Sequence, residues 1–298
     1  MTTPVPALPD PALDDDSLAV ALAEGAGQVL LGLRTAIDAA DGSFDARELK
    51  DAGDAAAQSW LAAALAHARP SDAVLSEEAK DDAARLDADR VWIIDPLDGT
   101  REFSERSDDG AASGGWRDDF AVHVALWARG VDDATDGPGG LATSAVALPA
   151  RAVVHTTGSP SSATDQDAAA RAVLAGDRPL RIAASRSRPP AFVAALAERD
   201  DVELVPMGSA GVKVVSVVDG TVDAYVHGGG QYEWDSAAPV GVALAAGHVA
   251  TRLDASALEY NRQDPWLPDL FVCHPALAAH LRDALQEVGV VIKEGAQS

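Results

Sequence analysis

Two long stretches near the start of the chain repeat apolar residues at the spacing of one helix face. The first stretch follows an acidic segment that ends in Ser17, which suits a helix N-terminus, and it extends to about Ala40. Its apolar face comprises Leu18, Leu22, Val29, Leu30 and Leu33. The second stretch runs roughly from Arg47 to Ala68 and ends before Pro70. The pattern therefore predicts two helices joined by a polar loop.

Short runs of β-prone apolar residues follow these helices, and each run is long enough for one strand. In the first half of the chain we expect strands at 73–78, 91–94, 120–127, 144–148 and 152–155, the last two as a hairpin. In the second half, extended and helical segments alternate at 180–184, 190–198, 202–205, 209–218 and 222–226, with a final strand at 268–273 and helix at 275–288. Strands that alternate with helices predict an α/β fold with helices on the sheet faces.

Loops rich in Gly, Ser, Pro and Asp divide this pattern into parts. A low-complexity loop at 156–179 separates an N-terminal α+β part, residues 15–160, from a C-terminal α/β part, residues 161–298. Residues 1–14 are expected to be a disordered tail. We further expect a mobile acidic connector at 79–90 and an insertion at 107–115.

The segment around Asp95 contains the strongest chemical signal. A short apolar run is expected to end at Asp95-Pro96, because proline lacks a backbone donor, and Asp98-Gly99 follows as a turn that can open a helix. Two carboxylates three residues apart, beside free amides, suit a divalent cation and a phosphate together. An EF-hand does not fit, because Leu97 stands where that loop needs an oxygen ligand.

Two longer motifs identify the family that this sequence resembles. The string from Trp92 to Phe103 resembles the first signature of the magnesium-dependent, lithium-sensitive phosphatases of the inositol monophosphatase superfamily. The string from Gln231 to Gly241, which contains Trp234-Asp235 before an Ala-rich helix, resembles their second signature. The resemblance covers roughly residues 18–290 and implies a layered α/β/α/β/α sandwich with the active site between its two parts.

The resemblance implies two or three Mg²⁺ ions and a set of ligands for them. Glu77, Asp95 and the Leu97 carbonyl would hold one ion, and Asp95, Asp98 and Asp235 would hold a second. Such oxygen ligands are those that hard cations prefer. Glu77 belongs to a Glu-Glu pair at a strand end, as in the family.

The same resemblance implies the residues that act on the substrate. The amides of Gly99 and Thr100 would bind phosphate oxygens, and Asp54 together with Thr100 would orient the attacking water. The match at Asp54 is incomplete, because Asp51 stands where the family usually has threonine. Segments that contain Ser185, Arg186 and Lys213 would line the pocket of the leaving group. Glu77, Leu97, Asp98 and Asp235 would also lie at the bound phosphate. His123, a lone histidine in an expected strand, is assigned no role.

The residues after the first signature indicate the substrate. Arg101-Glu102-Phe103 is typical of the 3′(2′),5′-bisphosphate nucleotidase (CysQ) branch, and Gln231 to Pro239 resembles its actinobacterial members. The implied activity is removal of the 3′-phosphate from 3′-phosphoadenosine 5′-phosphate, a by-product of sulfate assimilation. The alternatives are inositol 1-phosphate or fructose 1,6-bisphosphate as substrate. A non-catalytic phosphate- or metal-binding regulator is an alternative from another class, but all the acidic side chains of the site are present.

Composition limits the compartment and the partners. The chain has 298 residues and a formal net charge of −24, which argues against nucleic-acid polymers and anionic membranes as partners. Cys273 is the single cysteine, so an intrachain disulfide is impossible and a reducing compartment is expected. No uninterrupted apolar run has the length of a transmembrane helix, and the start lacks the basic residues of a secretory signal. We therefore expect a cytoplasmic enzyme, with a homodimer left open.

Overall fold

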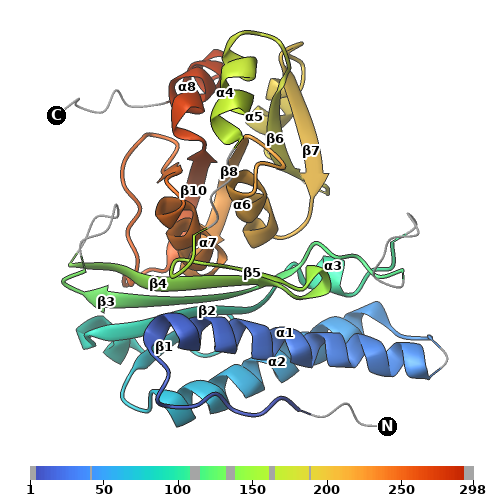
Figure 1. Ribbon diagram of the computed structural model, residues 1–298, viewed down its shortest axis with the longest axis vertical. Helices are drawn as coiled ribbons and strands as arrows, with labels where there is room; N and C mark the ends of the chain where they lie inside the picture. The colour runs from blue at the N-terminus through green and yellow to red at the C-terminus, as the bar shows by residue number, and fades with distance from the viewer. Residues whose placement is uncertain are drawn as a thin grey trace.

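The chain folds into two five-stranded sheets and three layers of helices (Figure 1). The computed structural model describes residues 5–40, 42–107, 115–131, 138–160, 165–187 and 189–291. Helices α1 and α2 cover one face of the first sheet, α6 and α7 lie between the sheets, and the remaining long helices cover the outer face of the second sheet. This arrangement confirms the predicted layered α/β/α/β/α sandwich.

Two long helices form the first layer, α1 (Asp15–Ala39) and α2 (Ala46–Ala68). Aspartates cap both: Asp14 accepts from the amide of Ser17 at 2.8 Å, and Asp45 accepts from the first amides of α2. The helices pack closely where Gly25 faces Trp60. A Cβ atom at Gly25 would lie 2.0 Å from the Trp60 ring, so only glycine allows this approach. The predicted positions of both helices are therefore confirmed.

The first sheet has the strand order β1-β2-β3-β4-β5, with β1 parallel to β2 and the other neighbours antiparallel. Its strands are β1 (Ala73–Ser76), β2 (Arg90–Asp98), β3 (Ala121–Arg129), β4 (Gly139–Leu148) and β5 (Val153–Thr156). Both faces are covered by helices, so β3 is almost wholly buried.

The second sheet has the order β7-β6-β8-β10-β9. Its strands are β6 (Leu180–Ser185), β7 (Val202–Met207), β8 (Ala224–Tyr232), β9 (Val249–Thr251) and β10 (Trp266–Cys273). Strand β6 runs parallel to both neighbours, whereas β10 is antiparallel to β8 and β9. The sheets lie on either side of the predicted division at residue 160, and that division stays a prediction.

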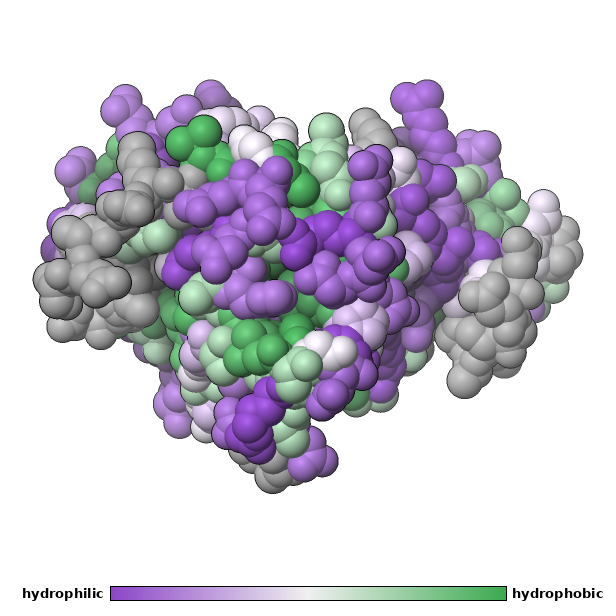
Figure 2. All heavy atoms as spheres, turned by 90° about the horizontal axis from the view of Figure 1, so that it is seen from above, coloured by the Kyte–Doolittle hydropathy of each residue, from purple (hydrophilic) through white to green (hydrophobic). Residues whose placement is uncertain are grey.

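The other helices complete the layers. The inner pair is α6 (Ala210–Val218) and α7 (Glu233–Ala245), and the outer helices are α4 (Gln166–Leu174), α5 (Ala191–Leu196) and α8 (Ala278–Glu287). Short helical turns are α3 (Thr100–Phe103), η1 (Ala83–Asp87), η2 (Pro149–Arg151) and η3 (Pro275–Leu277). The face seen from above is largely hydrophilic, with small apolar areas, in keeping with the strongly charged composition (Figure 2).

Two segments expected to be disordered or mobile are held by side chains. Within the predicted tail, Pro6 accepts a hydrogen bond from Trp60 at 3.1 Å, and the carbonyls of Pro11 and Leu13 accept from Arg69. The predicted mobile connector contains η1, whose Arg85 is 1% exposed and bonds to Asp81 and to residues 261 and 262. Long-range partners thus hold the connector and residues 6–13 of the predicted tail, which corrects the expectation for these residues.

Three boundaries also differ from the prediction. Strand β2 does not stop at Asp95-Pro96 but runs to Asp98, because a register shift against β3 accommodates the proline. The predicted loop at 156–179 contains α4, and the strand expected at 222–226 is β8, which continues to Tyr232. The insertion at 107–115 lies almost entirely outside the described residues.

Helix α1 is long and apolar enough to cross a membrane by length and composition alone. Half of its most apolar window is buried inside the structure, where it contacts α2, β3 and β4. Its apolar face therefore belongs to the core of this fold.

Candidate functional site

Three aspartates from the two halves of the molecule converge between the sheets. Asp95 and Asp98 lie at the end of β2, and Asp235 lies in the first turn of α7. One carboxylate oxygen from each lies within 4.8 Å of the other two. Asp95 and Asp98 are buried, and Asp235 is half-buried. The structure thus brings together three of the predicted metal ligands.

The carboxyl groups in this cluster repel one another. Burial raises the pKa of Asp95 well above its ordinary value, and the charges of Glu77 and Asp98 raise it further. Burial and the charge of Asp98 raise the pKa of Asp235 to about 6. A divalent cation held by these oxygens would offset that repulsion, so the donor set fits a hard metal ion.

Glu77 lies at the edge of this cluster, just after β1, where its amide reaches the carbonyl of Ile94 at 3.4 Å. Its side chain keeps contact with solvent. Crowding by protein atoms and the charges of Asp235 and Asp98 nevertheless raise the pKa of Glu77 to about 7, and a hydrogen bond with Asp95 partly offsets this. The predicted fourth ligand is therefore adjacent to the three aspartates.

Asp98 differs from its neighbours because several donors meet at its carboxylate. Its Oδ2 accepts hydrogen bonds from Ser209 Oγ and from the Gly211 amide, the latter at 2.7 Å, and it lies 3.2 Å from His123 Nε2. Burial alone would raise the pKa of Asp98, but the His123 charge and these hydrogen bonds bring it below its ordinary value. Asp98 therefore stays ionised at neutral pH.

The residues predicted to act on water and phosphate lie just after β2 and on helix α2. Gly99 adopts φ of 88°, which favours glycine, and Thr100 is the first residue of α3. The Leu97 amide donates to Asp95 at 3.0 Å, and the Leu97 side chain is buried. Asp54 is half-buried on α2, and burial, followed by the charges of Glu78 and Asp51, raises its pKa to about 7.

A cavity of about 590 Å³ adjoins the aspartates. Asp98 and Asp235 line one side, and Ser185 and Lys213 line it as predicted. The Lys213 ammonium is almost fully buried, donates to the carbonyl of Ser209 at 2.8 Å and lies 5.5 Å from the centre of the Tyr225 ring. Its buried charge faces a space large enough for a nucleotide-sized ligand.

Arg186, which was also predicted to face this pocket, bonds to two acidic side chains of the first half. Its guanidinium bonds to Asp119 at 2.5 Å and to Glu102 at 3.4 Å. It is not among the described residues that line the cavity. Arg186 thus links the end of β6 to the segment around α3, and its contact with substrate stays a prediction.

Sequence reasoning missed several residues of the site. His123 was assigned no role, yet it is paired with Asp95 across β2 and β3 and contacts Asp98. That register cannot be seen in a single sequence. The cavity is also lined by Tyr225, His227 and the Gly228–Gly230 run. The three consecutive glycines were a visible signal that the prediction did not use.

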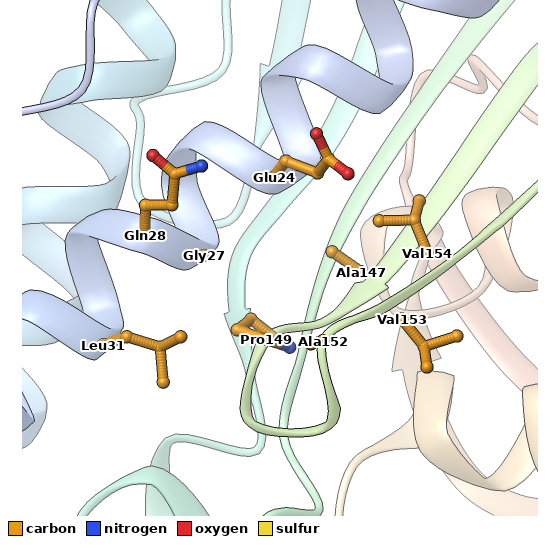
Figure 3. A pocket seen from close by; sticks show the side chains of 9 residues that line it. All are labelled: Glu24, Gly27, Gln28, Leu31, Ala147, Pro149, Ala152, Val153 and Val154. Atoms are coloured by element: carbon orange, nitrogen blue, oxygen red, sulfur yellow. The ribbon is translucent and has the colours of Figure 1, made fainter.

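A second cavity, of about 260 Å³, lies between α1 and the turn that joins β4 to β5 (Figure 3). Its lining is mostly apolar, and Glu24 and Gln28 lie on its helix side. None of the predicted site residues lines it, so it has no part in the chemistry of the aspartate cluster.

Comparisons with known proteins point to one family. The inositol monophosphatase family profile matches residues 14–135 and 142–288. A 3′-phosphoadenosine 5′-phosphate phosphatase from Mycobacterium leprae (strain TN) is 48% identical over 278 residues, which cover 93% of this chain and 95% of that protein. Among solved structures, CysQ from Bacteroides thetaiotaomicron superposes with a TM-score of 0.63 at 27% identity, covering 87% of this chain and 97% of that one. Inositol monophosphatase-II from Staphylococcus aureus MSSA476 superposes with a TM-score of 0.65 at 18% identity, covering 91% of this chain and 95% of that one.

Proposed function

The chain belongs to the inositol monophosphatase family, and on that premise we propose that it removes the 3′-phosphate of 3′-phosphoadenosine 5′-phosphate, giving AMP and phosphate. The observation that carries the choice of substrate is Lys213 in the cavity beside Asp98 and Asp235. Among the described residues that line this cavity, Lys213 alone carries a formal positive charge when histidine is neutral. A bisphosphate offers that cation a second anionic group, which a cyclitol monophosphate lacks. The name of the Mycobacterium leprae relative supports the same substrate.

The family is metal-dependent, and we propose Mg²⁺ as the ion, held by Asp95, Asp98 and Asp235 with Glu77 and the Leu97 carbonyl beside them. When bound, such ions stabilise the charge that develops on the phosphoryl and leaving oxygens. The side chains and amides of the protein orient the substrate. Lys213 would pair with the second phosphate of the substrate, and the amides of Gly99 and Thr100 would bind oxygens of the phosphate that is removed.

We propose direct attack of water on phosphorus, with Asp54 and Thr100 orienting the water. The water oxygen forms a bond to phosphorus while the bond from phosphorus to the 3′-oxygen breaks. One water proton passes to Asp54, the departing 3′-oxygen takes up a proton from solvent water, and Asp54 then returns its proton to solvent. The half-buried position of Asp54, which raises its pKa to about 7, suits a group that accepts a proton near neutral pH. Cytoplasmic localisation and homodimeric assembly stay predictions from the sequence.

Phosphate release with Mg²⁺ tests the proposal. We would compare 3′-phosphoadenosine 5′-phosphate, 3′-AMP, inositol 1-phosphate and fructose 1,6-bisphosphate, with an Asp98→Asn preparation as the control for contaminating phosphatases. We expect kcat/KM to be highest for the bisphosphate nucleotide, by on the order of tenfold or more over 3′-AMP, because 3′-AMP lacks the charge that Lys213 can pair with. A higher kcat/KM for inositol 1-phosphate would refute the choice of substrate and leave the phosphatase activity standing.

A further inference from the structure

His123 lies where the two halves of the molecule meet. It occupies the middle of β3 in the first sheet, and its side chain is 0% exposed. Helix α6 approaches it so closely that a Cβ atom at Gly211 would lie 2.0 Å from His123 Nε2. An apolar side chain would fill a buried position at lower cost than an imidazole, which must be hydrogen-bonded there. The polar contacts of the His123 ring are therefore the feature that distinguishes it from an apolar side chain at this position.

The two ring nitrogens contact two different metal-binding elements. Nε2 lies 3.2 Å from Asp98 Oδ2, and Nδ1 lies 3.0 Å from the carbonyl oxygen of Trp234. A carbonyl only accepts hydrogen bonds, so Nδ1 carries a hydrogen and donates it. Trp234 directly precedes Asp235 in the first turn of α7. Because an imidazole ring is rigid, the two contacts together fix the separation between the Asp98 carboxylate and the turn that bears Asp235.

The Asp98 carboxylate is oriented from both halves of the molecule. Ser209 Oγ and the Gly211 amide reach Oδ2 from the start of α6, whereas His123 reaches the same oxygen from the first sheet. The two hydrogen bonds and the His123 contact all meet at Oδ2, so Oδ1 is the oxygen that we expect to face a cation. His123 also contacts α7, through the carbonyl oxygen of Trp234.

We propose that His123 is a positioning residue for the divalent cation. It holds the carboxylate of Asp98 and the helix turn of Asp235 at the separation that one ion requires, and it sets the affinity for that ion without touching it. This inference rests on the proposed function, because it takes Asp95, Asp98 and Asp235 as the ligands. Groups that orient ligands in this way typically change metal affinity by about 10-fold to 100-fold when they are removed.

Direct metal binding provides the first test. The metal-free protein would be titrated with Mn²⁺, and free Mn²⁺ would be followed by electron paramagnetic resonance. His123→Leu removes both contacts at similar size, and we expect its Kd for Mn²⁺ to rise by about tenfold or more. His248→Leu is the matched control, because His248 is also buried but its ring contacts His274, away from the aspartates. The control should leave the Kd unchanged, whatever its effect on the melting temperature.

Kinetics provide a readout that a purely structural role would not move. In His123→Leu, the Mg²⁺ concentration for half-maximal activity should rise, whereas the substrate KM at saturating Mg²⁺ should change by less than about twofold, because the ring is placed to act on the ligands and not on the substrate. His123→Gln keeps amide donors and should recover part of the affinity. An increased KM with unchanged Mg²⁺ dependence would overturn the inference.

The outcomes separate this inference from the proposed function. A folded His123→Leu protein with the wild-type Kd for Mn²⁺ overturns the inference alone. If His123→Leu does not fold, the Mn²⁺ titration is repeated with His123→Gln. A wild-type Kd for Mn²⁺ in that variant, which lacks the rigid ring, overturns the inference. Failure of the wild-type protein to bind Mn²⁺ overturns the metal site of the proposed function, and the inference with it. A wild type that prefers inositol 1-phosphate leaves the inference intact.

Discussion

The three aspartates of the site have the same side chain but different proton affinities. The pKa of Asp98 lies below its ordinary value, because His123, Ser209 and Gly211 stabilise its ionised form. The pKa values of Asp95 and Asp235 are raised by burial and by neighbouring carboxyl groups. Asp98 is therefore a permanent anion at neutral pH, and the other two need a cation to become ionised together.

Replacing a single carboxylate should impair catalysis without unfolding the protein. We expect Asp98→Asn and Asp235→Asn each to lower kcat by on the order of a hundredfold or more, because the bound ion contributes several kcal/mol of transition-state stabilisation. Asp118→Asn is the matched control, since its carboxylate is exposed and pairs with Arg151. Near wild-type turnover in both site variants, with circular dichroism unchanged, would refute the ligand assignment.

Lys213 should determine the choice between substrates. Its ammonium uses one donor on Ser209 and has two more for a phosphate in the cavity. Lys213→Met should raise KM for 3′-phosphoadenosine 5′-phosphate by roughly tenfold to a hundredfold, the cost of a charge-assisted contact, and change KM for 3′-AMP much less. The two substrates are measured on the same preparation. Equal losses for both would show that Lys213 supports the fold of the site and does not recognise the second phosphate.

At the scale of elements, glycines allow the close approach of helices. Gly25 of α1 faces the ring of Trp60 on α2, and Trp60 in turn donates to the carbonyl of Pro6. This contact joins both helices and the segment before α1. The same principle operates at the site, where Gly211 allows α6 to reach His123.

Gly25→Ala should destabilise the protein, although alanine favours helix. The gain in helix propensity is about 1 kcal/mol, whereas forcing a methyl group into the Trp60 ring costs about 1–3 kcal/mol and also disturbs the contact with Pro6. The midpoint of urea unfolding measures the balance. Glu24→Ala, at the adjacent exposed position of the same helix, should leave that midpoint nearly unchanged. A stabilised Gly25→Ala protein would mean that Trp60 can move aside at little cost.

The sequence predicted the elements well where the signal is local. Periodic apolar residues and an acidic N-terminus located α1, the stretch that ends before Pro70 located α2, and the two signature strings located Asp95, Asp98 and Asp235. Arg85 was placed in a mobile connector, because its partners lie at 261 and 262, far along the chain. His123 was missed for the same reason. Its contacts with the metal-binding residues depend on strand register and on a helix residue 111 positions away. Long-range pairing is what a single sequence leaves undetermined.

At the scale of the whole molecule, negative charge exceeds positive charge both overall and at the site. The net charge is −24, and burial raises the pKa of Glu233 to about 7, in the same helix turn as Asp235. Asp54 and Glu77 have pKa values raised to about 7 as well. Without a cation, these groups thus bind protons more tightly in the folded state than in the unfolded chain.

The metal-free protein should lose stability as pH rises. Groups with raised folded-state pKa values contribute stability that is present below their unfolded values near pH 4 and is lost as pH rises through about 6 to 7. In chelator, the melting temperature should therefore be lower at about pH 8 than at about pH 5.5. Saturating Mg²⁺ should raise the melting temperature at about pH 8 and reduce the difference between the two pH values. Identical pH dependence with and without Mg²⁺ would contradict the site.

The division of the ligands between two sheets has a consequence for folding rates. Asp98 belongs to the first sheet and Asp235 to a helix on the second half, and the contact from His123 to Trp234 spans 111 positions. Contacts between such distant segments form late, because the intervening chain must be ordered first. An ion that needs both halves can bind only after they have docked. Mg²⁺ would therefore slow unfolding and leave the refolding rate almost unchanged, so that it prolongs the lifetime of each folded molecule.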